Sequence, residues 1–314
     1  MEKTGFSHQK HSNKQGNLTS RLPSFCPLAG ERHFPQKIER INLDGFSKEV
    51  NQEELNQIRI RRIFEVYAGH LSSHEIIFFS RCQMKNTNEE SLQAWEANAD
   101  YWDSKMGDNS NYFHCHLVRP NTEKLLDIKY GDFVLDIACG NGNFSQRLAK
   151  NGAIVVAFDY STKLIEHAKK RRSDVLDKVE FCVCDATDYN QLLKLKRKTP
   201  FNKAVSNMAI MDISDIEPLF KAVYDMLSDD GIFVFSTHHP CFTHPEGKYL
   251  TPCLHKGEAL RGQPLLQNYY HRSLQKILNL AFNRGFVLDK FFEVADDDAE
   301  MPILMTVRLI KLQK

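Results

Sequence analysis

Residues 132–145 read DFVLDIACGNGNFS, and this stretch decides the fold. An apolar strand runs through Asp136 into a turn that contains Gly140 and Gly142, and the sequence predicts a helix over residues 143–150. Glycine has no Cβ, so the backbone can turn tightly and approach a ligand closely, while free N–H groups at the helix start point toward that ligand. The stretch therefore predicts a cradle for a nucleotide-type ligand.

The spacing of this turn disfavours two common nucleotide-binding motifs. A dinucleotide fingerprint has a third glycine where Ser145 stands, and a P-loop requires a Gly-Lys-Ser/Thr sequence that the turn lacks. A Gly-x-Gly turn alone is also compatible with an ordinary connection between a strand and a helix. The residues downstream of the turn decide between these readings.

Acidic or amide side chains end the strands predicted after the turn. The apolar run 153–158 has the composition of a strand that is buried on both faces, and it ends at Asp159. A carboxylate there can accept hydrogen bonds from ribose hydroxyls, although it can equally cap the helix predicted over 162–172. Open α/β sheets bind ligands at the carboxyl ends of their strands, so we expect one crevice there. The residues that end the strands predicted over 153–158, 179–184 and 204–206 are Asp159, Tyr160, Ser161, Asp185, Ala186, Asn207 and Asp212.

The turn resembles the Asp-x-Gly-x-Gly-x-Gly motif of class I methyltransferases that depend on S-adenosylmethionine (SAM). Asp136, Gly140 and Gly142 match the motif, and Ala138 replaces its first glycine. The resemblance covers residues 91–314 and implies SAM as the cofactor, with Asp185 accepting a hydrogen bond from the adenine amino group. The cofactor-binding residues that we expect are Asp136, Ala138, Gly140, Asn141, Gly142, Asp159, Tyr160, Ser161, Asp185, Ala186, Asn207, Asp212 and Trp102.

The end of the chain supports the same fold. The sequence predicts a helix over 270–283, then strands over 286–295 and 303–312 joined by a connection too short for a helical crossover. Those two strands are therefore expected to pair antiparallel. The fold class that we predict is α/β, with a Rossmann-like sheet of seven strands, mostly parallel with an antiparallel C-terminal hairpin, flanked by helices and preceded by a short N-terminal extension.

The chain has 314 residues, of which 42% are hydrophobic, and its composition changes along its length. Residues 1–37 are polar and predicted to be disordered, because they contain too few apolar side chains to offset chain entropy. Residues 38–90 are predicted to be an accessory segment of unknown role, with a helix over 51–67 and a strand or short helix over 74–81. Residues 91–314 are the expected methyltransferase domain.

Several residues are candidates for the acceptor side of the site. His238 and His239 follow the fifth predicted strand, 231–236, where an imidazole can act as a general base, although either ring can also simply pack or face solvent. Trp95 and Trp102 are seven residues apart on one predicted helix face, which suits either a cover over the cofactor or ordinary packing. Weaker candidates for site contacts are Tyr101, Asn111 and His114.

Two other readings of the loop after the fifth strand are open. Its Cys and His side chains are zinc-type ligands, but their spacing matches no recognised structural finger. Cys241 also stands where RNA 5-methylcytosine methyltransferases carry a nucleophile, although residues 207–209 lack both the Pro-Cys of that class and the Asn-Pro-Pro-Tyr of amino-methylating nucleic-acid enzymes. The possible metal ligands are Cys241, His244, Cys253 and His255.

Charge favours a small-molecule acceptor over a nucleic acid. The chain has 41 Lys plus Arg and 40 Asp plus Glu, a formal net charge of +1, whereas nucleic-acid enzymes usually carry a basic surplus. The basic runs 169–172 and 194–198 are expected to be solvated faces. A catalytically silent SAM-binding regulatory subunit and an RNA methyltransferase are the alternatives to a small-molecule enzyme.

The sequence also predicts the cellular setting. No segment has the ~20 consecutive apolar residues that span a bilayer, and no apolar signal region follows the polar start. The eight cysteines are scattered without a paired framework, as expected for reduced thiols. We therefore expect a cytoplasmic protein with no membrane partner, whose oligomeric state the sequence leaves open.

Overall fold

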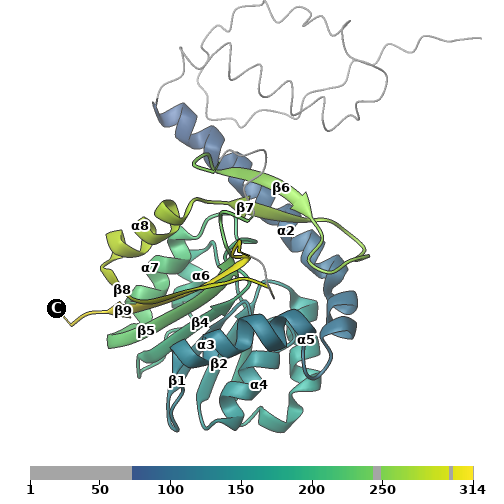
Figure 1. Cartoon of the computed structure of the whole chain (residues 1–314), viewed down its shortest axis with the longest axis vertical. Helices are drawn as coiled ribbons and strands as arrows, with labels where there is room; N and C mark the ends of the chain where they lie inside the picture. Colours follow the sequence, from purple (N-terminus) through teal and green to yellow (C-terminus); the bar gives the residue numbers. More distant parts are fainter. Residues whose placement is uncertain (1–72, 243–248, 297–299, 314) are drawn as a thin grey trace, which may run out of the picture. The chain divides into compact units, whose positions relative to one another are not determined.

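A seven-stranded sheet lies at the centre of the computed structural model, which describes residues 73–242, 249–296 and 300–313, with side chains from Thr87 onward (Figure 1). The strand order is β3-β2-β1-β4-β5-β9-β8. Strands β1 to β5 pair in parallel, whereas β9 is antiparallel to both β5 and β8. The strands are β1 Phe133–Ile137, β2 Ile154–Asp159, β3 Val179–Val183, β4 Phe201–Asn207, β5 Leu227–His238, β8 Phe286–Val294 and β9 Leu304–Lys311.

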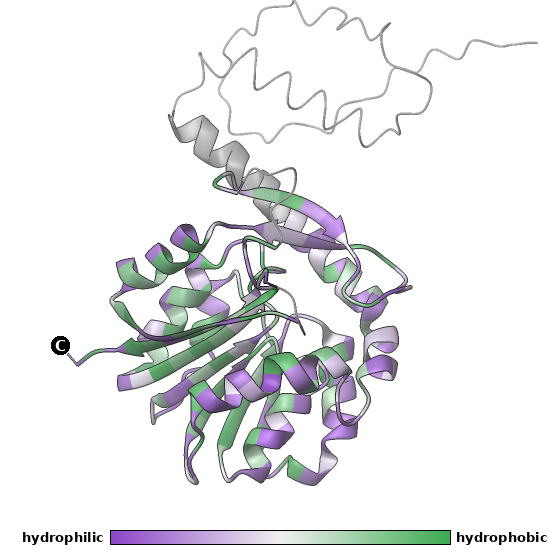
Figure 2. Cartoon of the chain, in the orientation of Figure 1, coloured by the Kyte–Doolittle hydropathy of each residue, from purple (hydrophilic) through white to green (hydrophobic). Residues whose placement is uncertain are grey.

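Helices cover both faces of this sheet. Apolar side chains of α3, α4 and α5 pack on one face, and those of α6, α7 and α8 pack on the other. Figure 2 shows apolar residues concentrated in the inner strands and on the helix faces turned toward them. The helices after residue 110 are the π-helix η1 His114–Val118, α3 Arg119–Leu126, α4 Asn143–Lys150, α5 Thr162–Arg171, the 3₁₀ helix η2 Ser173–Val175, α6 Tyr189–Leu193, α7 Glu217–Met226 and α8 Leu274–Arg284.

The sequence of β2 illustrates why the inner strands form. Val155 and Ala157 pack on the α4 side of the sheet, while Val156 and Phe158 pack on the α7 side. A strand with both faces covered needs apolar residues at every position, because successive side chains point to opposite faces. The run 153–158 therefore forms an interior strand, and the mostly parallel seven-stranded sheet with its C-terminal antiparallel strands confirms the predicted fold class.

One predicted helix boundary is wrong. The helix expected over 270–283 begins only at Leu274, because Ser273 caps it by accepting a hydrogen bond from Lys276 N. Tyr270 belongs instead to β7, Gln267–His271, which pairs with β6, Cys253–Gly257, in a separate antiparallel hairpin. The sequence analysis did not predict this hairpin, which follows β5 in the chain.

A long helix, α2 Ser73–Met106, precedes the sheet and runs without a break through residue 90. It contains the segment 74–81, for which the sequence left strand or helix open. The end of α2 lies along α5, and its middle lies beside β7 (Figure 1). Asn98 joins α2 to the hairpin side, since its side chain donates to Leu265 O and accepts from Leu265 N at 2.8 and 2.9 Å.

Residues 70–314 form one compact unit, and the unit 1–69 lies outside the described residues. The helix predicted over 51–67 and the disordered tail 1–37 therefore remain predictions. No helix in the described ranges has the length and apolar character to cross a membrane.

Candidate functional site

A cleft of about 100 Å³ opens at the carboxyl ends of the parallel strands, where open α/β sheets bind ligands. We call it the main cleft. Of the residues predicted to bind a cofactor, those that line it are Ala138, Gly140, Asp159, Tyr160, Asp185, Ala186, Asn207, Asp212 and Trp102. The other lining residues are Asn88, Ser91, Trp95, His114, Phe158, Leu164, Cys184, Thr187, Met208, Ala209 and Ile213.

The glycine turn forms one wall of the main cleft. Gly140 and Gly142 have φ of 57° and 74°, in the left-handed region that favours glycine. A Cβ on Gly142 would lie 2.9 Å from the Phe181 ring, so the turn also needs glycine for close packing. Ala138 has φ 53°, so alanine occupies a left-handed position where the related motif has glycine.

Asp159 is buried and held in place by backbone N–H groups. Its Oδ2 accepts from Gly140 N at 2.9 Å and its Oδ1 from Ser161 N at 3.0 Å. Burial raises the pKa of this carboxyl, and these backbone hydrogen bonds oppose the rise. A carboxylate has about four acceptor positions, so Asp159 can still accept hydrogen bonds from a ligand in the main cleft.

Four predicted cofactor residues do not line the main cleft. Asp136 lies beneath the turn, where Ser145 Oγ donates to its Oδ2 at 2.6 Å, and burial raises its pKa to about 7. Asn141 donates to Asp103 Oδ1 at 2.9 Å. Gly142 occupies the N-cap position of α4, and Ser161 caps α5 by accepting from Leu164 N. These residues shape the turn and its flanking helices.

Asn88 is a site residue that the sequence analysis missed. Its side chain donates to Asp185 Oδ2 at 2.9 Å and to Thr187 Oγ1 at 3.2 Å, so it connects α2 to the end of β3. Tyr160 lies beside the same carboxyl, and burial together with Asp185 raises its pKa to about 12. No motif marks Asn88, because its role depends on α2 crossing the mouth of the cleft.

Aromatic side chains from α2 cover the main cleft. The rings of Trp95 and Trp102 meet edge to face with centroids 5.3 Å apart, as their seven-residue spacing on one helix face predicts. The His114 ring lies 6.0 Å from that of Trp102. Burial, with smaller contributions from Arg119 and His238, lowers the pKa of His114 to about 4. Of the weaker candidates, His114 lines the cleft, whereas Tyr101 and Asn111 do not.

The structure separates the two candidate bases. His238 lines a second, smaller cavity of about 20 Å³ together with Met211 and Thr237, and burial lowers its pKa to about 4. His239 lines neither cavity. Its Nδ1 lies 2.7 Å from Cys241 Sγ and its Nε2 lies 2.9 Å from Glu293 Oε1, toward β8.

The metal hypothesis gains no support from the described residues. Cys241 contacts His239, whereas Cys253 and His255 lie on β6 and His244 falls outside the described residues. Within the described ranges, no group of three or more His, Cys, Asp or Glu side chains is arranged to hold a metal ion.

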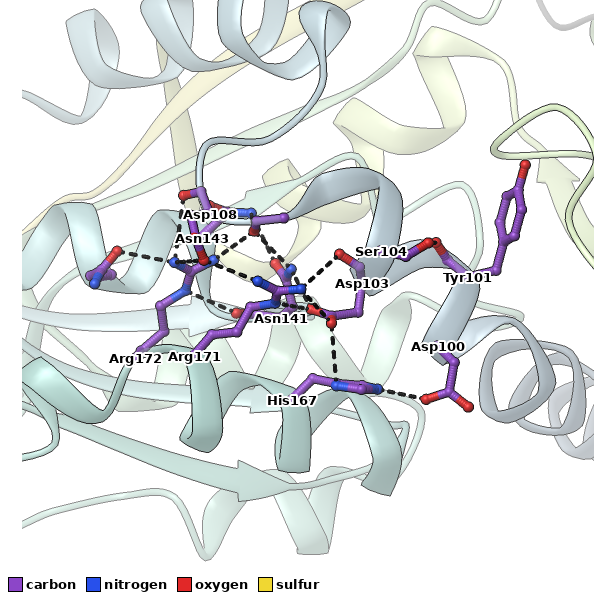
Figure 3. Close-up of polar contacts among 12 residues, drawn as sticks. Asp100, Tyr101, Asp103, Ser104, Asp108, Asn141, Asn143, His167, Arg171 and Arg172 are labelled. Carbon is purple, nitrogen blue, oxygen red and sulfur yellow. Dashed lines mark hydrogen bonds and ion pairs between the residues drawn. The ribbon is translucent and has the colours of Figure 1, made fainter.

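Part of the basic run 169–172 is buried, which corrects the expectation of a solvated face. Lys169 and Lys170 are exposed, but Arg172 is buried and donates to Asn141 O and Gly107 O at 3.2 and 3.0 Å. Arg171 forms a two-nitrogen ion pair with Asp103, with its Nη2 2.8 Å from Oδ2. Figure 3 shows these contacts, which we call the α2 clamp, between α5, the end of α2 and the glycine turn.

The contacts of the α2 clamp favour the ionised form of Asp103. Burial of Asp103 opposes its ionisation, but hydrogen bonds from Arg171 and Asn141 outweigh burial and hold the pKa of the Asp103 carboxyl below its usual value. The His167 ring adds contacts to Asp100 at 2.8 Å and Asp103 at 3.3 Å. The clamp therefore fixes the segment that carries Trp102 above Gly140.

Comparisons with known proteins agree with this geometry. Residues 128–277 match a family described as "Methyltransferase domain". A segment of 105 residues is 26% identical to a protein of Geobacillus sp. (strain WCH70) assigned as a methyltransferase, covering 33% of this chain and 42% of that protein. A segment of 158 residues is 24% identical to the ubiquinone biosynthesis O-methyltransferase of Actinobacillus pleuropneumoniae serotype 5b. It covers 49% of this chain and 66% of that protein. The chain thus spans under two thirds of each relative's length.

The fold comparison points the same way. A solved structure from Listeria monocytogenes, assigned as an S-adenosylmethionine-dependent methyltransferase, matches with a TM-score of 0.52 at 20% identity, covering 62% of this chain and 97% of that one. Residues 128–277 therefore match a methyltransferase domain family, and the sheet shares its fold with this solved structure. SAM is the cofactor that the resemblance of the glycine turn predicts for this fold.

Proposed function

We propose that this protein transfers a methyl group from SAM to a small-molecule acceptor. The observation that carries the proposal is the arrangement of Asp159 and Asp185 at the ends of adjacent strands, facing one cleft with the glycine turn. The lining residues of the main cleft, all within the described part of the chain, include no Lys or Arg. A cleft without cations offers no track for a nucleic-acid backbone, which supports a small acceptor.

The residues of the main cleft fit SAM. Asp159 has acceptor capacity left for the two ribose hydroxyls. Asp185 lines the same cleft and is the residue that the resemblance assigns to the adenine amino group. Apolar side chains such as Leu164 and Ile213 suit the faces of the base. Bound SAM supplies a methyl group already activated by a sulfonium, so the protein mainly positions the reactants and excludes water.

His238 is the proposed general base. Its pKa of about 4 keeps the imidazole neutral near pH 7, so the ring has a free lone pair for the proton of an acceptor hydroxyl. His238 also lies close enough to His114 in the main cleft for the two rings to interact electrostatically. This proximity to His114 supports a base beside the main cleft.

Calorimetry tests the cofactor assignment. SAM and S-adenosylhomocysteine should bind, with NAD and ATP much weaker. Asp159→Ala removes charge-assisted hydrogen bonds to the ribose and should weaken SAM binding by roughly tenfold to a hundredfold, on the order of 1.5 to 3 kcal/mol. Asp177→Ala, at an exposed position, is the matched control. Equal SAM affinity for wild type and Asp159→Ala would place Asp159 outside the site.

Labelled SAM distinguishes an enzyme from a silent subunit. The protein is incubated with the small-molecule fraction of a cell extract and, separately, with its RNA. Label in a small product supports the proposal, and label in RNA would overturn it. SAM binding without turnover in either fraction would favour a regulatory subunit.

Replacement of His238 tests the base. His238→Ala should lower turnover by roughly 100-fold while SAM affinity stays nearly intact, because a base acts in the transition state. His239→Ala and Cys241→Ser identify the alternative. If His239→Ala is inactive while His238→Ala is active, His239 takes the proton instead. If Cys241→Ser is inactive while His238→Ala is active, Cys241 performs covalent chemistry.

A further inference from the structure

Three side chains outside the main cleft form a connected group, which we call the thiol triad: Cys241, His239 and Glu293. Cys241 Sγ lies 2.7 Å from His239 Nδ1, and His239 Nε2 lies 2.9 Å from Glu293 Oε1. A nucleophile within reach of a base, with the base oriented by a third group, is the arrangement that activates a nucleophilic side chain. None of the three residues lines the main cleft or the smaller cavity, so the proposed methyl transfer does not use them.

Three separate segments bring the thiol triad together. Phe242 N donates to His239 O at 2.9 Å, which closes a turn directly after β5 and carries Cys241 back beside the His239 ring. His239 N donates to Ile303 O at 2.9 Å, so the start of this turn is fixed to the segment before β9. Glu293 comes from β8, which pairs with β9 on the side opposite β5.

The contacts of the His239 ring determine where its proton lies. Cys241 N donates to Nδ1 at 3.2 Å, so Nδ1 presents a lone pair and the ring proton is on Nε2. That proton faces the Glu293 carboxylate, which can only accept. Burial lowers the pKa of His239 more than Glu293 raises it, so the imidazole is neutral near pH 7. The Nδ1 lone pair can therefore take a proton from the thiol.

The Cys241 thiol needs a base of this kind. Burial raises the pKa of the thiol, so it keeps its proton near pH 7, whereas the thiolate is the reactive form. The Cys241 side chain is still partly exposed, and its sulfur lies 3.6 Å from Met301 Sδ. The neighbouring Glu293 carboxylate disfavours anionic reagents, so the site suits a small, uncharged oxidant.

We propose that Cys241 is a thiol that reacts with peroxide, with His239 as its base and Glu293 as the residue that positions this base. The thiol proton passes to His239 Nδ1 while the sulfur attacks one oxygen of hydrogen peroxide. The sulfur–oxygen bond forms as the oxygen–oxygen bond breaks, and the departing hydroxide takes the proton from the imidazolium. The sulfur is oxidised to a sulfenic acid, and the peroxide is reduced to water.

Dimedone, which labels sulfenic acids, measures this reaction. Full-length protein is treated with hydrogen peroxide and dimedone, and mass spectrometry follows the label at each cysteine with time. Cys241 should be labelled at least roughly tenfold faster than Cys182, because a positioned base assists only Cys241. Cys182 is also partly exposed, but its thiol contacts the Glu180 carboxylate at 3.6 Å. Equal labelling of the two cysteines overturns the proposal.

His239→Gln tests the base. The rate at Cys241 should fall roughly 100-fold while the rate at Cys182 stays unchanged, because an amide cannot take the thiol proton. His116→Gln, the same change at an exposed position in η1, is the control and should leave both rates unchanged. If His239→Gln keeps the wild-type rate at Cys241, His239 is not the base and the proposal fails.

Glu293 provides a second test that does not disturb the buried ring. Glu293→Gln keeps an acceptor oxygen for the Nε2 proton and should keep most of the rate at Cys241, whereas Glu293→Leu should lower it roughly tenfold. Both variants should melt near the wild-type temperature, because the Glu293 side chain is 54% exposed. Loss of rate in both variants, or in neither, overturns the positioning role. If His239→Gln unfolds, this comparison decides the proposal.

Discussion

At the scale of single residues, Ala138 shows the clearest mismatch between residue type and backbone conformation. A residue with a Cβ is strained at φ 53°, by roughly 1–2 kcal/mol relative to the right-handed region. Ala138→Gly should therefore raise the free energy of unfolding by about 1 kcal/mol, the gain being reduced by the greater freedom of glycine in the unfolded chain. Urea unfolding measures the change.

Ala149 provides the control for this substitution. It is a buried residue in the interior of α4, where glycine costs about 0.5–1 kcal/mol relative to alanine. Ala149→Gly should thus destabilise the protein while Ala138→Gly stabilises it. Destabilisation by both changes would mean that the strain at Ala138 is compensated by contacts of its methyl group.

Asp136 should make stability depend on pH. Its pKa is about 7 in the folded protein, because of burial, against 3.8 for the model carboxyl. Between pH 3.8 and pH 7 the folded state therefore keeps a proton on Asp136 that the unfolded state has released. The stability that goes with this protonated carboxyl is present at low pH and lost as the pH rises toward 7. Asp136→Asn does not titrate, so its stability relative to wild type should rise across this range, by about 3 kcal/mol from about pH 5 to about pH 8.

Unfolding of both proteins at pH 5 and pH 8 checks this expectation. Asp225→Asn, whose wild-type carboxylate accepts a hydrogen bond from the Tyr189 hydroxyl at 2.7 Å on the surface, is the control. A difference between wild type and Asp136→Asn that stays constant with pH would show that Asp136 keeps its charge when buried.

At the scale of elements, the α2 clamp determines how firmly the cleft is covered. Arg171→Met removes the ion pair to the largely buried Asp103 and should destabilise the protein by about 1–3 kcal/mol, because a charge-assisted hydrogen-bond partner is lost. The looser end of α2 should also lower SAM affinity roughly tenfold, or about 1.4 kcal/mol. Unfolding and calorimetry measure the two effects.

Arg197→Met is the matched control for the α2 clamp. Arg197 pairs with Glu180 at 2.6 Å, and both side chains are more exposed than those of the clamp. Exposed pairs contribute only about 0–1 kcal/mol, so this variant should keep near wild-type stability and SAM affinity. Equal behaviour of the two variants would mean that the clamp does not control the cleft.

The elements differed in how well the sequence predicted them. The strands β1 to β3 and helix α4 were predictable because continuous apolar runs and a glycine turn are local signals. The hairpin β6–β7 was not, because Gln267, Asn268 and Tyr269 are polar or amphipathic and acquire buried positions only through contact with α2 and Asp212. The same long-range packing explains why Arg172 is buried although its sequence context is a basic run.

At the scale of the whole molecule, the side chains at the strand ends of the main cleft were more predictable than those from α2 and the β6–β7 hairpin. The positions of Asp159 and Asp185 could be predicted from one rule, that parallel strands bring their carboxyl ends together. Asn88, Gln267 and Tyr269 come from segments that obey no such rule, and a helix and a hairpin distant in sequence must first meet. Prediction of how these two segments contribute therefore needed the assembled fold.

The two-sided attachment of α2 has a further consequence for the complete protein. On one side the α2 clamp and Glu96 tie the helix to α5, and on the other Asn98 and Ser91 tie it to the β7 segment. A ligand that orders α2 through contacts on one side also favours ligand binding on the opposite side of the helix. If the proposed acceptor binds on the β7 side, the two occupancies are thermodynamically linked, and S-adenosylhomocysteine changes acceptor affinity by the same factor as the acceptor changes that of S-adenosylhomocysteine.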